Sequence, residues 1–88
     1  MQQLLNIINE KGLHARASAK FVETVEQFDA GAVVRKDGLS ADGDSIMGLL
    51  MLAAANGTSI EVETRGAEAV ALAEALRDLV ANRFGEAA

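Results

Sequence analysis

One short segment of the chain holds the residues whose types and spacing could do chemistry. His14, the only histidine, follows Gly12-Leu13 and stands two residues before Arg16. A helix is predicted to begin here, and the first amides of a helix lack internal partners and lie at the positive end of its dipole. A phosphoryl group on the His14 ring could therefore accept hydrogen bonds from the amides of Ala15, Arg16 and Ala17.

The charges beside His14 favour the same chemistry. Arg16 brings a planar, permanently charged donor suited to phosphate oxygens, and Lys20 adds positive potential one helical turn further on. Imidazole attacks phosphorus when it is neutral. The residues alone leave two alternatives open: a small α+β regulatory or ligand-binding module in which His14 only caps its helix, and a small acylphosphatase-like hydrolase.

Other kinds of site find little support in the sequence. The chain has no Cys and one His, which excludes thiolate chemistry and argues against a metal site made of protein ligands. It has no glycine-rich phosphate loop of the nucleotide-dependent kinases. Glu23 and Glu26 would lie roughly 13 to 18 Å along the helix axis from His14, too far for acid–base partnership. We therefore expect no metal and no cofactor.

Length and charge narrow the class of protein. The chain has 88 residues, which predicts a single domain over residues 1–88. Its net charge is −5, whereas binding to nucleic acid or to an anionic membrane requires an excess of positive charge. The N-terminal segment carries neither a basic stretch nor a signal-like apolar run. We expect a cytoplasmic protein without membrane insertion.

Periodicity and turn residues predict the elements that must position His14. A helix is expected to begin at Ala15 and to end at Asp29-Ala30-Gly31. Phe21 and Phe28 flank its buried stripe, which consists of Ala15, Ser18, Ala19, Val22, Val25 and Glu26. The other expected elements are the strands 2–8, 32–35, 39–41 and 58–64, a short helix over 46–53 and a long helix over 67–84, with a tight turn at Asp37-Gly38. The order β-α-β-β-α-β-α predicts a two-layer α+β sandwich with a largely antiparallel sheet.

The short helix over 46–53 has two features of its own. Ser45, in Gly43-Asp44-Ser45, supplies a hydroxyl that can cap the helix. The helix is apolar on nearly every side, so Met47, Leu50 and Met51 are expected to form an exposed docking patch, with core packing as the alternative. The acidic residues of the last strand and helix are expected on solvated faces; they are Glu61, Glu63, Glu68, Glu74 and Asp78.

The segment Gly12-Leu13-His14-Ala15-Arg16 resembles the active-site motif of the HPr family, the small histidine phosphocarriers of the phosphoenolpyruvate-dependent phosphotransferase system. The similarity covers nearly the whole chain, and Asp44-Ser45-Ile46-Met47-Gly48 resembles the regulatory serine region of the family. The resemblance implies an open-faced β-sandwich: a four-stranded antiparallel sheet covered on one face by three helices, with His14 at its edge.

The resemblance also implies a phosphoryl relay. His14 Nδ1 would accept the group from a phosphorylated enzyme I type protein and pass it to a histidine of an acceptor protein, with Arg16 at the phosphate. Ser45 would be a regulatory site for a serine kinase/phosphorylase, and Met47, Leu50, Met51 and Lys20 would contact partners. The protein would then be a monomeric carrier and not a turnover enzyme.

One position departs from the family pattern. Ala17 stands where the family commonly has Pro in the first turn of the helix. Ala gives up a preset φ angle and supplies an N–H that Pro lacks, directed toward the phosphate site. The Gly-Leu-His-Ala-Arg-Ala pattern resembles that of carriers in the regulatory branch of the system more than that of carriers in sugar uptake. The regulatory branch is concerned with nitrogen, carbon or potassium balance.

Overall fold

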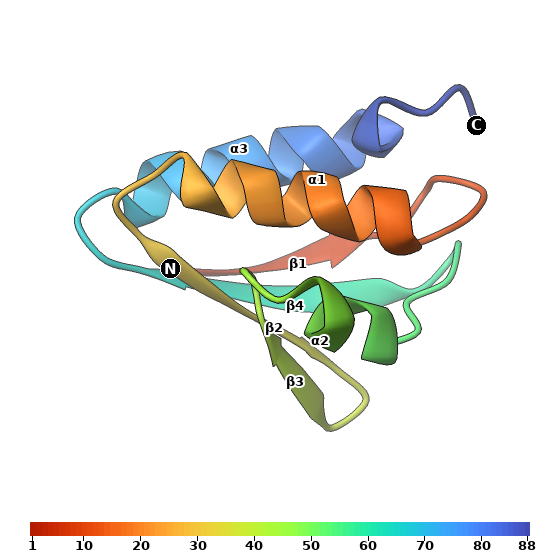
Figure 1. Ribbon diagram of the computed structural model, residues 1–88, viewed down its shortest axis with the longest axis horizontal. Helices are drawn as coiled ribbons and strands as arrows, with labels where there is room; N and C mark the ends of the chain where they lie inside the picture. Colours follow the sequence, from red (N-terminus) through yellow and green to blue (C-terminus); the bar gives the residue numbers. More distant parts are fainter.

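The computed structural model describes residues 1–88 and contains seven regular elements and one short turn (Figure 1). In chain order they are β1 (Gln2–Asn6), α1 (Ala15–Glu26), β2 (Gly31–Lys36), β3 (Leu39–Asp42), α2 (Ile46–Met51), β4 (Ser59–Arg65), α3 (Ala69–Ala81) and a 3₁₀ turn (Arg83–Gly85). This confirms the predicted order β-α-β-β-α-β-α. No helix combines the length and the apolar character needed to cross a membrane.

The four strands form one antiparallel sheet in the order β1-β4-β2-β3. Leu5 of β1 lies opposite Ile60 of β4, and Val34 of β2 lies opposite Val62 of β4. Helices α1, α2 and α3 lie on the same side of this sheet, and its other side is uncovered (Figure 1). The predicted open-faced, four-stranded α+β sandwich is therefore confirmed.

The core lies between the sheet and the helices, and successive side chains of β4 point alternately into this core and onto the open face. Its inward residues Ile60, Val62 and Thr64 are fully buried, whereas Glu61 on the open face is exposed. The largest fully buried side chains above the sheet are Phe21 of α1, Phe84 of the 3₁₀ turn, and Leu49, Leu72 and Leu76. Packing of α1 on this layer sets the direction in which its N-terminus, and therefore His14, faces.

The buried stripe of α1 differs from the predicted one at its two ends and at Ala19, which is only half-buried. Ala15 and Glu26 are exposed, and the buried residues are Ala17, Ser18, Phe21, Val22 and Val25. Phe21 is the bulkiest side chain of the helix and enters the core. Ala15 and Glu26 lie about 120° to 140° round the helix from it and so face solvent.

Two predicted helices end earlier than expected. Helix α2 ends at Met51, and α3 ends at Ala81 instead of continuing to Phe84. Arg83 and Phe84 adopt positive φ angles of 54° and 55°, which no continuing helix allows. This reversal directs the chain toward α1, where Lys20 Nζ donates to the Phe84 carbonyl at 2.5 Å. The Phe84 ring is fully buried in the core.

One acidic side chain is not on a solvated face as predicted. Glu63 lies on the open side of the sheet, but its side chain is only 9% exposed because Arg65 and Arg35 contact it, the latter at 3.0 Å. Hydrogen bonds from Arg65, and then from Arg35, hold the pKa of Glu63 below its ordinary value. The other four acidic residues of this group are exposed, as expected.

Candidate functional site

A tight loop carries the chain from β1 to the start of α1 and positions His14. Gly12 has a φ of 67°, and a Cβ there would overlap the Ala54 carbonyl. Leu13 is buried, and its N–H donates to the same carbonyl at 2.8 Å. The loop is therefore held against the segment that follows α2, and His14 comes directly after this anchored point.

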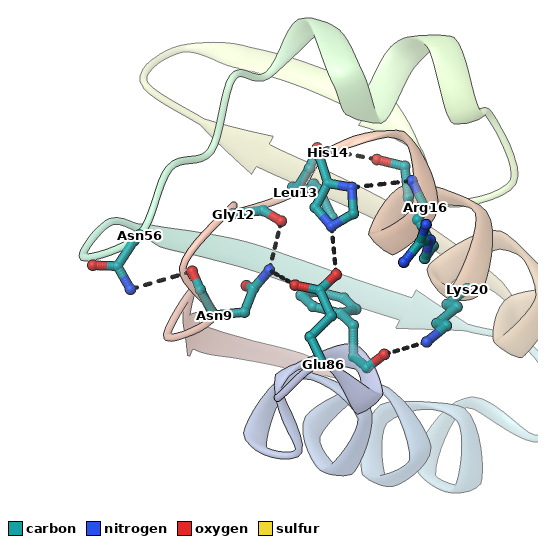
Figure 2. A network of polar contacts seen from close by, with 10 residues as sticks. Asn9, Gly12, Leu13, His14, Arg16, Lys20, Asn56 and Glu86 are labelled. Carbon is teal, nitrogen blue, oxygen red and sulfur yellow. Dashed lines mark hydrogen bonds and ion pairs between the residues drawn. The ribbon is translucent and has the colours of Figure 1, made fainter. Parts of the chain in front are cut away.

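His14 is the N-cap of α1. Its backbone is extended, with a φ of −75° and a ψ of −177°, and its carbonyl accepts the Ser18 N–H at 2.8 Å. The ring Nδ1 accepts the Arg16 N–H at 3.2 Å, so the lone pair of Nδ1 points at the helix start (Figure 2). The side chain is 26% exposed and borders a pocket of about 390 Å³, which Arg16, Lys20 and Glu86 also line.

The start of α1 offers further donors to an anion. The N–H groups of Ala15 and Ala17 have no hydrogen-bond partner, and Ser18 is the first residue of the helix whose amide is bonded to a preceding carbonyl. The guanidinium of Arg16 forms no ion pair and lies in an exposed residue. The structure thus brings together the residues that the sequence predicted around His14.

Lys20 lies on the same pocket, but its ammonium group is engaged. Its Nζ donates to the carbonyl of Phe84, so the side chain ties α1 to the segment after α3 (Figure 2). Its charge therefore adds positive potential to the pocket from a fixed place. The structure contains no group of three or more His, Cys, Asp or Glu side chains that could hold a metal ion.

Two residues that the sequence did not reveal complete the surroundings of the ring. Glu86 contacts His14 Nε2 through Oε2, and its Oε1 accepts the side-chain amide of Asn9 at 3.0 Å (Figure 2). The donation from Asn9, with a smaller contribution from His14, holds the pKa of Glu86 below its ordinary value although burial opposes this. Glu86 is 72 residues from His14 in the chain, so no local spacing connects them.

Helix α2 lies next to His14 and carries the other predicted site residues. Ser45 is its N-cap, and its Oγ accepts the Gly48 N–H at 3.0 Å. Met47 and Met51 are 69% and 74% exposed, and Leu50 is half-buried. A second pocket is lined by both Leu50 and His14. Met47 and Met51 are thus exposed on α2, Leu50 is half-buried beside the ring, and Leu49 of the same helix is in the core.

Comparison with known proteins shows the family to which this chain belongs. The family model described as "PTS HPr component phosphorylation site" matches residues 1–82. The chain belongs to the HPr family of phosphocarrier proteins. It is 51% identical over 86 residues to the phosphocarrier protein HPr of Neisseria meningitidis, covering 98% of this chain and 97% of that protein. The HPr of Cupriavidus necator is 43% identical over the same coverage.

Solved HPr structures have the same fold. HPr of Thermoanaerobacter tengcongensis superposes with a TM-score of 0.94 at 33% identity, covering 100% of this chain and 99% of that one. HPr of Bacillus anthracis superposes with a TM-score of 0.86 at 35% identity, covering 91% of this chain and 95% of that one. The resemblance stated from the sequence is therefore confirmed. The general role of the chain is that of an HPr phosphocarrier of the phosphotransferase system. Membership of this family implies partner proteins such as enzyme I.

Proposed function

We propose that the chain carries the phosphoryl group on Nδ1 of His14, taking it from a phosphorylated enzyme I type protein and passing it to a histidine of an acceptor protein. The single observation that carries this is the direction of the Nδ1 lone pair, which faces the start of α1. There the Ala15 and Ala17 amides are unpaired and the Arg16 guanidinium is free to bind phosphate oxygens.

The transfer needs few rearrangements at this site. The Nδ1–P bond forms as the bond between phosphorus and the donor breaks, and the electron pair of that bond leaves with the donor. The phosphoryl oxygens then replace Nδ1 as acceptors for the amides at the helix start, so the cap of α1 is kept. One Arg and one helix end stabilise the group without holding it too tightly, which suits a carrier that must release it.

Incubation with phosphoenolpyruvate and an enzyme I preparation tests the proposal. We expect an acid-labile, alkali-stable phosphoryl adduct that is absent from His14→Ala. Arg16→Ala should slow transfer about tenfold, because a charge-assisted hydrogen bond to the phosphate is lost. Arg77→Ala, which removes an exposed Arg from α3, is the matched control and should transfer normally. An adduct of unchanged yield on His14→Ala would overturn the proposal.

We further propose that Met47, Leu50 and Met51 form the docking patch, and that Lys20, which lines the other pocket at His14, also contacts partners. Leu50 and His14 line one pocket, so a partner seated in that pocket contacts both the ring and α2. Met47→Asp should raise the enzyme I concentration that gives half-maximal transfer. The control is Val70→Asp on α3, where the residue is 58% exposed. Equal effects of the two substitutions would contradict a docking role.

Ser45 is, in our proposal, a regulatory phosphorylation site for a serine kinase/phosphorylase. Its hydroxyl is half-buried and already caps Gly48, so a phosphate could take over the cap while its charge interferes with docking on α2. Ser45→Asp should slow transfer from enzyme I, and Ser45→Ala should not. Equal transfer rates for both variants would remove this role.

We also propose that residues 1–88 fold as one domain and that the carrier is a monomer. In our proposal it serves the regulatory branch of the phosphotransferase system. Sedimentation of the purified protein measures its oligomeric state. Transfer of labelled phosphate from the protein to acceptors in a lysate of the source cells identifies the branch. Labelling confined to a sugar-uptake acceptor would contradict the assignment.

A further inference from the structure

We propose that Glu86, itself held by Asn9, is a positioning residue that keeps the proton of the His14 ring on Nε2 and so presents Nδ1 as the nucleophile. This inference rests on the proposed role of His14 as the phosphoryl acceptor. It adds to that role the groups that decide which ring nitrogen reacts.

The two ring nitrogens face different partners. Nδ1 receives the N–H of Arg16 and therefore acts as an acceptor, which in a neutral imidazole leaves the proton on Nε2. Nε2 faces Oε2 of Glu86, a carboxylate oxygen that accepts this proton's hydrogen bond (Figure 2). With the roles reversed, an N–H on Nδ1 would point at the N–H of Arg16, and an unprotonated Nε2 would point at a carboxylate. Both contacts thus favour one tautomer.

Asn9 holds the carboxylate in place. It is fully buried, and its backbone carbonyl accepts the side chain of Asn56 at 3.2 Å. Its Nδ2 donates to Glu86 at 3.0 Å and to the carbonyl of Gly12 at 2.8 Å. Its Oδ1 is buried without a partner. Turning the amide over would set that oxygen against two acceptors, so the donor side must face Glu86.

The segment that carries Glu86 is anchored as well. Phe84 is buried in the core, and its carbonyl is bonded to Lys20. The N–H of Glu86 donates to the Arg83 carbonyl at 2.9 Å. The Glu86 side chain is only 14% exposed. Its carboxylate is therefore held beside the ring by backbone, core and side-chain contacts.

This arrangement has a consequence for the reaction itself. As Nδ1 bonds to phosphorus, positive charge develops on the ring, and the proton stays on Nε2 between the ring and Glu86. A carboxylate at that position stabilises the developing charge and keeps the ring orientation, as carboxylates paired with catalytic histidines do. Transfer in either direction passes through the same charged ring and so gains from the same contact.

The test reads the tautomer directly in protein labelled with ¹⁵N in His14. At a pH where the ring is neutral, the nitrogen chemical shifts of the wild type should show the proton on Nε2. Glu86→Ala removes the acceptor, and in Glu86→Gln the amide of Asn9 competes for the only side-chain oxygen. Both variants should therefore show a larger fraction of the Nδ1–H form. Glu10→Gln, which removes a nearby carboxylate without a side-chain contact to the ring, should match the wild type.

The rate of phosphoryl transfer from enzyme I gives the second readout. We expect both Glu86 variants to transfer about three- to tenfold more slowly than the wild type. Suppose that the wild type is phosphorylated on His14 but both Glu86 variants have the same ¹⁵N chemical shifts as the wild type. This result would overturn the positioning role of Glu86 and leave the proposed function standing. Absence of a His14 adduct in the wild type would overturn the proposed function itself.

Discussion

Replacing Gly12 with Ala tests whether the loop geometry before His14 is as tightly determined as the contacts indicate. Gly12 and Gly38 both have left-handed backbones, with φ of 67° and 81°. A Cβ on Gly12 would overlap the Ala54 carbonyl and lie 2.9 Å from Ala55 Cα, whereas nothing lies within 4 Å of a Cβ on Gly38. Gly38→Ala is therefore a control that carries the conformational cost alone.

The expected magnitudes follow from these two surroundings. An Ala in the left-handed region costs about 1 kcal/mol at either position. Gly12→Ala adds the overlap with backbone atoms, which cannot rotate away as a side chain can, and overpacking of this kind costs about 1 to 3 kcal/mol. The total loss is thus about 2 to 4 kcal/mol for Gly12→Ala, less than the 5 to 15 kcal/mol typical of folded domains.

Urea unfolding followed by circular dichroism measures both losses, and the phosphoryl transfer assay measures the effect on His14. Gly12→Ala should lose more free energy of unfolding than Gly38→Ala and should also transfer more slowly, because its loop carries the ring. Gly38→Ala should transfer at the wild-type rate. Equal losses of stability in the two variants would refute the steric reasoning.

Three further outcomes are expected. Ala17→Pro removes an N–H that has no partner in the free protein, so it should preserve transfer and change the hydrolytic lifetime of phospho-His14; identical lifetimes would exclude a role for this amide. Ser45→Ala removes the cap on Gly48 and should cost about 1 kcal/mol in urea unfolding; no change would show that the hydrogen bond is dispensable. Because the pKa of Glu63 is lowered on folding, its stabilisation is present above the ordinary carboxyl pKa of 4.5 and is lost as the pH falls below it. Glu63→Gln should therefore be less stable than the wild type at neutral pH and lose less on acidification, as thermal unfolding between pH 3 and 7 would show; parallel profiles would count against the contribution of Glu63.

Much of the fold followed from local patterns in the chain. The Asp37-Gly38 turn has the positive φ angles that its residues predicted, 51° and 81°. The alternation of Ile60 and Val62 with polar residues matches the faces of β4, because side chains alternate along any strand. The end of α3 could not be predicted in this way, since Arg83 and Phe84 adopt positive φ angles that residues of their types rarely take.

The candidate site also has one part that local sequence predicts and one part that depends on tertiary packing. A histidine at a helix start, with Arg16 two residues on, is a local feature that the chain specifies through helix geometry alone, and the structure places His14 there. Glu86 reaches the ring, and meets Asn9 of the loop after β1, only because α3 packs on the sheet beside α1 and the chain then reverses toward that loop. Local hydrogen bonding determined which lone pair faces the helix, and tertiary packing supplied the carboxylate that faces the other nitrogen. A contact across 72 residues exists only after the core has formed, because it is the burial of Phe84 and its neighbours that brings the two segments together.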